Sequence, residues 1–136
     1  MEHLERFGVS MPAGLLAEFD AAISQAGYAN RSEAVRDLAR DYLVRRQWAT
    51  PGGQVAGTIT LVYDHHTREV EDTLTALQHD CGDSIVCTTH VHLDHHHCLE
   101  AIVVRGRSEE IRAIADRLLS TRGVMHGGLT VTAAAG

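Results

Sequence analysis

The sequence predicts an α+β protein with two small domains, a strand–helix–helix unit followed by a β-α-β-β-α-β unit. Apolar residues alternate with period two in some segments and recur at helical spacing in others, and this change of period separates strands from helices. The stretch from Trp48 to Gln54 contains Pro-Gly-Gly, has the composition of a linker and divides the two patterns. A hydrophobic content of 44% in 136 residues is typical of a globular chain of one or two domains.

The first half predicts one strand and two helices. Residues 6–11, "RFGVSM", alternate apolar with polar or small side chains, as on a half-buried strand. Pro12 suits the first turn of a helix over residues 13–26. Asn30 can cap a second helix, with Glu33 three residues later in the capping-box position. One short strand and two helices bury little apolar surface, so we expect this half to be stable only as a dimer.

The second half predicts a ferredoxin-like arrangement, because its elements follow the order β-α-β-β-α-β. The expected strands are 55–63, 84–93, 97–105 and 124–133, and the expected helices are 67–80 and 108–121. Two helices cover only one face of a four-stranded sheet. The other face is therefore available to a ligand or to another subunit.

Composition restricts the functional class. The net charge is -6, which counts against non-specific binding of nucleic acid. All twelve basic residues are arginine, and they still allow a small basic DNA-binding domain, called the reading head below. Three cysteines without a secretory signal or a membrane-spanning run favour reduced thiols in the cytoplasm. Nine of the ten histidines follow position 64, so a metal function belongs to the second half.

A metal-binding pattern lies in "THVHLDHHHC", residues 89–98. His90 and His92 are two apart on a predicted strand, so both side chains leave the same face. Cys98 starts the next strand and can fold back toward them. His79 ends a predicted helix and points away from the apolar stripe of that helix. A histidine there can simply stabilise the helix dipole, but beside a three-ligand cluster we favour a fourth ligand given to a neighbouring chain.

The other candidates near this cluster are weaker. Tyr63 and His65 lie where they could support the ligands or hold a weakly bound metal. His66 could likewise be a supporting or secondary ligand. The three histidines 95–97 could form a solvent-facing turn or a second, weaker metal site. Cys87 falls on the opposite strand face and is expected to be a buried apolar residue rather than a ligand.

Both the metal and the function of the cluster have alternatives: several ions fit it, and a zinc hydrolase or a storage or delivery protein could also contain it. Imidazoles with one thiolate suit several late first-row ions, and the ligand types alone do not choose among Ni(II), Cu(II) and Zn(II). The run His90-x-His92-x-Asp94-His95 also matches the HxHxDH signature of zinc hydrolases of the metallo-β-lactamase type. The 38 residues after Cys98 are too few for the remaining ligands and fold of such an enzyme, so we expect no enzymatic activity. A metal storage or delivery protein would leave the first half without a purpose.

The chain resembles the nickel-responsive transcriptional regulators, the NikR family, over nearly its whole length. The motifs that carry the resemblance are "RFGVSM", "GYANRSEAVRD", His79, "THVH", Cys98-Leu-Glu and "RGVMHG". The resemblance implies a ribbon–helix–helix DNA-binding domain over residues 1–48. It further implies a linker at 49–54 and an ACT-like domain for metal binding and tetramer formation over 55–136.

The family resemblance also implies a metal site and an activity. By position, His90, His92 and Cys98 of one subunit and His79 of another hold one Ni(II) per subunit in a square-planar site. The assembly is a homotetramer, a dimer of dimers. Members repress nickel-uptake genes when nickel is plentiful, so we expect a nickel-sensing repressor in the cytoplasm.

The same resemblance assigns the DNA contacts. Arg6, Gly8 and Ser10 would face the major groove of a palindromic double-stranded operator, although Gly8 departs from the Thr or Ser common in the family. Asn30, Arg31 and Ser32 would meet a phosphate at the start of the second helix. Glu33 and Asp37 match positions where some members bind a second cation, but being four apart on one helix face they could equally pair with Arg36 or Arg40.

Overall fold

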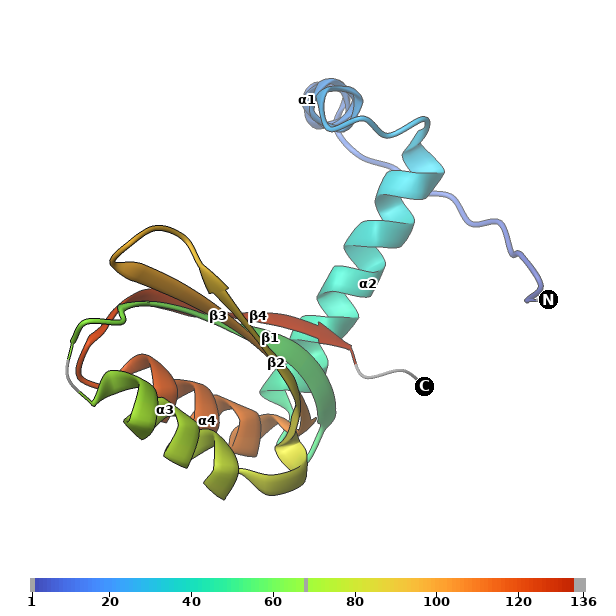
Figure 1. Ribbon diagram of the computed structural model, residues 1–136. Coiled ribbons are helices and arrows are strands. Elements are labelled where there is room, and N and C mark those ends of the chain that lie inside the picture. Colours follow the sequence, from blue (N-terminus) through green and yellow to red (C-terminus); the bar gives the residue numbers. More distant parts are fainter. Residues whose placement is uncertain (1, 68, 134–136) are drawn as a thin grey trace. The chain divides into compact units, whose positions relative to one another are not determined.

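The computed structural model describes residues 2–67 and 69–133 and divides into two compact units, residues 1–41 and 42–136 (Figure 1). Helix α1 spans Ala13–Gln25, and helix α2 spans Arg31–Ala49 and crosses the boundary between the units. Within the described residues, no helix combines the length and the apolar character needed to cross a bilayer. The predicted domain limits at 48 and 55 stay a prediction.

The two helices of the first unit begin as the sequence indicates. The Asn30 side chain accepts a hydrogen bond from the Glu33 amide (3.0 Å), and the Glu33 carboxylate accepts one from the Ala29 amide (3.4 Å). These bonds satisfy backbone donors at the start of α2, much as a capping box does, although Glu33 binds the amide of Ala29 rather than that of the cap residue Asn30. The expected strand over residues 6–11 is absent from the single chain. A lone segment has no neighbouring strand to share its hydrogen bonds, so a ribbon requires a second copy.

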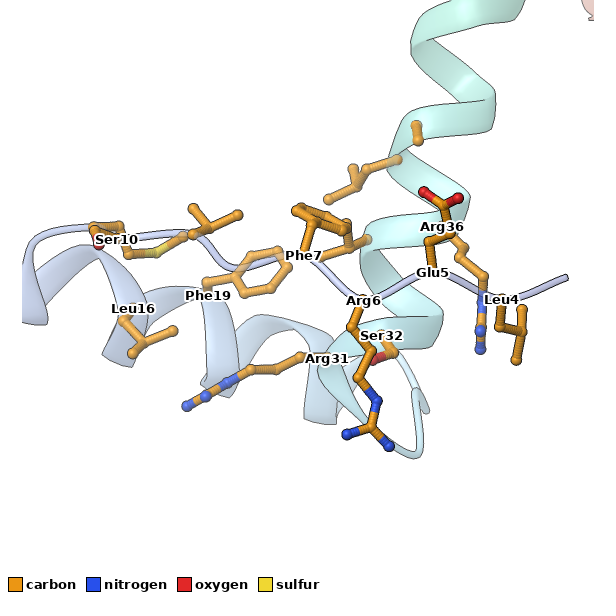
Figure 2. A pocket seen from close by; sticks show the side chains of 15 residues that line it. Leu4, Glu5, Arg6, Phe7, Ser10, Leu16, Phe19, Arg31, Ser32 and Arg36 are labelled. Atoms are coloured by element: carbon orange, nitrogen blue, oxygen red, sulfur yellow. The ribbon is translucent and has the colours of Figure 1, made fainter.

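Apolar side chains in the first unit remain largely uncovered. Phe7 is 75% exposed, Val9 66% and Leu15 53%, and α1 buries none of its residues. Phe7 and Val9, together with neighbouring side chains such as Leu16 and Phe19, surround an open hollow of about 1080 Å³ (Figure 2). This unit therefore lacks a core of its own.

The second unit is a four-stranded antiparallel sheet with two helices on one face (Figure 1). The strand order is β2-β3-β1-β4, which is the ferredoxin-like order predicted from the sequence. The α+β fold class is confirmed. The elements are β1 Gln54–Asp64, α3 Val70–Asp80, the short 3-10 helix η1 Gly82–Ser84, β2 Ile85–His92, β3 His97–Arg107, α4 Ser108–Leu119 and β4 Val124–Ala133.

The core of the second unit lies between the sheet and its two helices. Alternate residues of β1 and β3 are buried, because successive side chains of a strand point to opposite faces. The fully buried side chains include Ile59, Leu61, Tyr63, Leu74, Cys98, Ile102, Ile111 and Leu118. A central, well-packed sheet therefore lies beneath the residues predicted to bind metal.

The end of α2 and the Pro-Gly-Gly stretch are attached to this sheet. Trp48 is 3% exposed, donates a hydrogen bond from its indole nitrogen to the Thr132 carbonyl (3.0 Å) and lies under the Arg112 guanidinium. The Gly53 carbonyl accepts a hydrogen bond from the Ser108 amide (2.9 Å). Residues 48–53 are thus fixed to the second unit by direct contacts.

Two adjacent glycines of β4 give a matched test of this packing. A Cβ on Gly127 would collide with the Thr60 carbonyl and with Leu119, whereas a Cβ on Gly128 meets nothing within 4 Å. We expect Gly127→Ala to lower the free energy of unfolding by about 1–3 kcal/mol, since overpacking forces neighbours to shift. Gly128→Ala should change it by about 0.5 kcal/mol or less. Urea unfolding followed by circular dichroism measures both, and equal losses would contradict this packing.

Candidate metal centre

Two neighbouring strands bring the predicted ligands together. β2 pairs with β3 so that His92 lies opposite Cys98 and His90 lies opposite Glu100. Directly opposite residues of an antiparallel pair share a face, and here it is the face that carries the buried Cys98 and Glu100. The Cys98 sulfur is 3.5 Å from His92 Nδ1, and the rings of His90 and His92 are 5.3 Å apart.

An irregularity at the start of β2 changes which other residues share this face. The register shifts between Ile85 and Cys87, so Ile85 pairs with Val104 whereas Cys87 pairs with Val103. Cys87 faces the side of the sheet without helices, which is the face that alternation from His90 predicts. It is exposed because both helices cover the opposite face, so the prediction that it is buried is wrong. The residue that the bulge moves is Ile85, which joins the face of the predicted ligands. Strict alternation cannot anticipate a bulge, because a bulge inserts one residue into the period of two.

Tyr63 and Glu100 hold His90 in place. The Tyr63 hydroxyl donates to the Glu100 carboxylate (3.2 Å), and His90 Nδ1 lies 3.3 Å from both groups. Gln78 of α3 donates to the second Glu100 oxygen (2.9 Å). A metal-binding histidine typically uses its other ring nitrogen for such a supporting contact, which leaves His90 Nε2 available.

Glu100 was missed by the sequence-based prediction. It is only 6% exposed, and its carboxylate accepts hydrogen bonds from the Tyr63 hydroxyl and the Gln78 side-chain amide. The sequence feature that could have revealed Glu100 is its position two residues after Cys98, because residues two apart on a strand share one face. An acidic residue on a buried face is costly unless it has polar partners, so its presence there indicates a polar centre.

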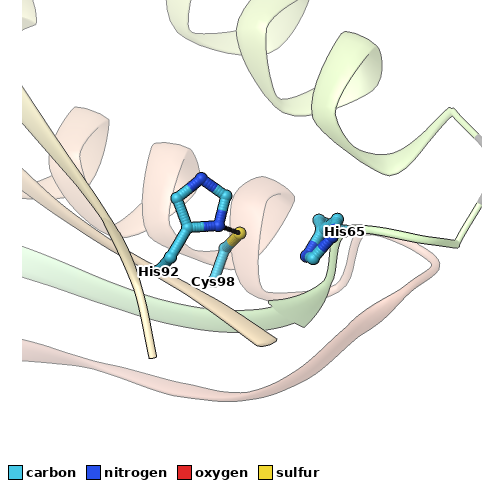
Figure 3. Close-up of side chains that lie close together, drawn as sticks. All are labelled: His65, His92 and Cys98. Carbon is cyan, nitrogen blue, oxygen red and sulfur yellow. Dashed lines mark hydrogen bonds between the residues drawn. The ribbon is translucent and has the colours of Figure 1, made fainter. Parts of the chain in front are cut away.

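The donor atoms of one chain come together in two overlapping sets. His65, His92 and Cys98 offer donor atoms within 4.8 Å of one another, and so do Glu71, His90 and Cys98. Figure 3 shows the rings of His92 and His65 flanking the Cys98 sulfur. His65 Nδ1 is buried and has no hydrogen-bond partner within the described part of the chain. Imidazoles, a thiolate and an orphaned ring nitrogen fit a late first-row divalent ion such as nickel.

The surroundings keep the cysteine protonated in the absence of a metal. Burial raises the pKa of the Cys98 thiol, and the neighbouring carboxylates of Glu71 and Glu100 raise it further. Burial likewise raises the pKa of Tyr63, again helped by Glu100, so this hydroxyl keeps its proton. A metal ion that binds here must displace the Cys98 proton.

The remaining predicted metal residues lie elsewhere. His79 is exposed near the end of α3 and belongs to neither of the two sets. Asp94 accepts hydrogen bonds from the His96 and His97 amides (2.8 Å each) and from the His97 ring (2.9 Å). The hydrogen bond with the His97 ring contributes most to holding the pKa of Asp94 well below its usual range, and the two amides lower this pKa further. Asp94 thus shapes the turn between β2 and β3.

The predicted DNA contacts lie in the first unit. Arg6, Gly8 and Ser10 are exposed near the N-terminus, and Asn30, Arg31 and Ser32 are exposed at the start of α2. The Arg31 guanidinium is bound to Asp20 by two hydrogen bonds of 2.8 and 2.7 Å, so it is already engaged in the free chain.

The two acidic residues predicted to hold a second cation have protein partners. Asp37 accepts from the Tyr28 hydroxyl (2.8 Å) and pairs with Arg40 (3.2 Å). The Glu33 carboxylate faces the Ala29 amide. A second cation at this place stays a prediction.

Comparison with known proteins agrees with this combination of domains. Residues 5–46 match the family model described as ribbon-helix-helix protein, copG family, and residues 56–132 match the NikR C terminal nickel binding domain. A putative nickel-responsive regulator of Solibacter usitatus is 57% identical over 132 residues, which cover 97% of this chain and 95% of the relative. A putative nickel-responsive regulator of Pyrococcus abyssi is 52% identical over 129 residues, which cover 95% and 94%.

These matches define a ribbon–helix–helix protein with a C-terminal nickel-binding domain. The chain belongs to the family of nickel-responsive regulators. Because this family consists of regulators, the literal match of residues 90–95 to a zinc-hydrolase signature does not indicate an enzyme. Asp94, which that signature would make a metal ligand, binds the backbone of its own turn instead.

The raised pKa of Cys98 predicts a pH dependence of metal binding. Below that pKa each bound ion displaces a proton, so the apparent nickel affinity should fall by about tenfold per pH unit between about pH 8 and pH 7. Titration with Ni(II), followed by thiolate-to-nickel absorption, measures this slope. Cys81→Ala removes another thiol, one that donates to the Leu77 carbonyl (3.0 Å), and should leave the slope unchanged. An affinity independent of pH would contradict thiolate binding at Cys98.

Proposed function

We propose that this protein is a nickel-sensing, DNA-binding repressor of nickel-uptake genes. The observation that carries the proposal is the register of β2 and β3, which gathers His90, His92 and Cys98 on one face in a chain that also has a ribbon–helix–helix unit. A storage or delivery protein would need the metal cluster but not the reading head. A regulator needs both the metal cluster and the reading head. As a regulator, the protein works in the cytoplasm, where its operator DNA lies.

The proposed ligands come from two subunits. His90, His92 and Cys98 form three corners of the centre in one chain, and the exposed His79 of another chain supplies the fourth. The stoichiometry is then one Ni(II) per subunit in a homotetramer built as a dimer of dimers. When bound, the metal supplies a cross-link between side chains of two subunits. Tyr63 and Glu100 orient His90 for this link, and α3 carries His79 to the subunit boundary.

The proposed reading head is a dimer of the first unit. Its uncovered apolar hollow has a size and lining suited to the same surface of a second copy (Figure 2). In such a dimer, residues 6–11 of two chains can pair as an antiparallel ribbon. Arg6, Gly8 and Ser10 would then meet the bases of a palindromic operator, and the start of α2 would meet a phosphate.

Metal and DNA binding are proposed to be coupled. Nickel bound by His79 orders α3 and so favours one arrangement of the tetramer. Operator binding favours the same arrangement. Such coupling is typically about 1–3 kcal/mol and is reciprocal, so operator DNA also tightens metal binding.

A complementation experiment tests whether two chains share the centre. His79→Ala and Cys98→Ala homotetramers should each lack tight nickel binding, so neither should show the thiolate-to-nickel band at one Ni(II) per subunit. Tetramers assembled from both variants should regain the band in part, because one chain supplies the three-ligand face and the other supplies His79. No recovery would mean that all ligands lie in one chain, and recovery in the Cys98→Ala homotetramer would exclude Cys98.

A gel shift tests the reading head. Arg6→Ala should weaken nickel-dependent binding to an operator fragment by about 1–3 kcal/mol, the value of one good base contact. Arg45→Ala removes an exposed arginine elsewhere on α2 and should have a much smaller effect. Both variants should retain the thiolate-to-nickel band. Operator binding that is independent of nickel in the unmodified protein would contradict the proposed function.

A further inference from the structure

We propose that His66 and His96 form a weak surface site for late first-row divalent ions, and that this site loads the buried centre through His65. The inference deepens the function proposed above and rests on it for the identity of the buried centre. Two loops form the site: the residues that follow β1 and the turn between β2 and β3. We call His65, His66, His95 and His96 the histidine corner.

The two loops of the histidine corner are joined and shaped by backbone hydrogen bonds. The His65 amide donates to the His96 carbonyl (2.9 Å), which ties one loop directly to the other. The side chain of Asp64 accepts from the His66 amide (2.9 Å), and the side chain of Asp94 accepts from the His96 amide (2.8 Å). The imidazoles therefore project from a pre-shaped surface rather than from free loops.

The hydrogen bonding of His66 prepares one of its ring nitrogens for a metal. Its Nε2 lies 3.0 Å from the His95 carbonyl oxygen. A carbonyl oxygen can only accept, so Nε2 carries the proton and Nδ1 of the neutral ring keeps its lone pair. A metal-binding histidine commonly donates its second N–H to a backbone carbonyl in this way.

The spacing of the two exposed rings also fits a shared ion. The ring centres of His66 and His96 are 5.2 Å apart, with an angle of 64° between the ring planes. An ion about 2 Å from one nitrogen of each ring, with its bonds near the tetrahedral angle, places the ring centres about 5 Å apart. Two imidazoles alone make a weak, rapidly exchanging site, as loading requires.

A continuous series of ligand side chains leads from this surface to the buried centre. The rings of His66 and His65 are 4.0 Å apart, and those of His65 and His92 are 5.5 Å apart. His92 is in turn 3.5 Å from the Cys98 sulfur. The inner members of the series, His65, His92 and Cys98, offer donor atoms within 4.8 Å of one another. An ion can therefore exchange one ligand at a time along the series.

The charge of the surroundings favours cation capture. A hollow of about 150 Å³ beside the corner is lined by His65 and His66 together with Glu69, Glu71 and Asp72. The Asp94 carboxylate, held in place by the His96 and His97 amides (2.8 Å each), adds a further acidic group to the turn. Like charges that line a concave surface raise the local concentration of the opposite ion.

The rate of nickel binding tests the loading route. Stopped-flow mixing with Ni(II) follows the growth of the thiolate-to-nickel band, whose rate reports loading and whose final amplitude reports the buried centre. The His66→Ala/His96→Ala double variant should load more slowly by about tenfold, the lower end of the gain in association rate that a raised local ion concentration gives. Its final amplitude should equal that of the unmodified protein. His95→Ala is the matched control, because it removes an exposed imidazole from the same turn and keeps the carbonyl that binds His66.

Two results would overturn the inference. One is a double variant that loads at the unmodified rate, and the other is a His95→Ala variant that is slowed as much as the double variant. A missing band in the unmodified protein would instead contradict the proposed centre, and with it the route. Equilibrium dialysis of nickel-saturated protein against further Ni(II) gives a second measurement. One additional, weakly held ion per chain should bind to the unmodified protein and to His95→Ala, and the double variant should lose it.

Discussion

The hydrogen-bonded register between β2 and β3 is the constraint on which the centre depends. It places His92 opposite Cys98 and His90 opposite Glu100, all on the face covered by the helices. A slip of one residue would move the β2 ligands to the uncovered face, because side chains alternate with period two. The sheet core beneath, with Ile102 and Leu61 fully buried, holds this register, so packing energy in the second unit maintains ligand geometry.

The centre also depends on polar groups that are buried beside the paired strands β2 and β3. Glu100 is buried with a hydroxyl and an amide as partners, and Cys98 is buried as a neutral thiol whose pKa is raised. These groups would destabilise an ordinary apolar core, and their partners offset part of that cost. The partners include Gln78 of α3, so the helix that carries His79 is already connected to the ligand face within one chain. In the proposed mechanism, this connection transmits metal binding to α3.

Particular residues show where sequence-based reasoning succeeded and where it failed. The pair His90 and His92 could be assigned to one face because β2 is regular after its bulge. Cys87 was assigned to the correct face, but it was expected to be buried and is exposed, because the helices cover only the opposite face. The strand over residues 6–11 was expected from its alternation, but its hydrogen-bond partner belongs to another chain. The engagement of Arg31 by Asp20 joins two helices and leaves no local signal in the sequence.

The sequence by itself determined the order of the elements, the ferredoxin-like class and the family, and it supplied the three-ligand pattern that stays a prediction. These properties are local, since periodicity, capping residues and short motifs are written within a few consecutive positions. Only the tertiary structure decided that Glu100 and Tyr63 hold His90, that His65 reaches Cys98, and that His66 and His96 meet at one corner. Those contacts join segments separated by about 30 residues, and their distances depend on strand register and loop path, which no local pattern specifies.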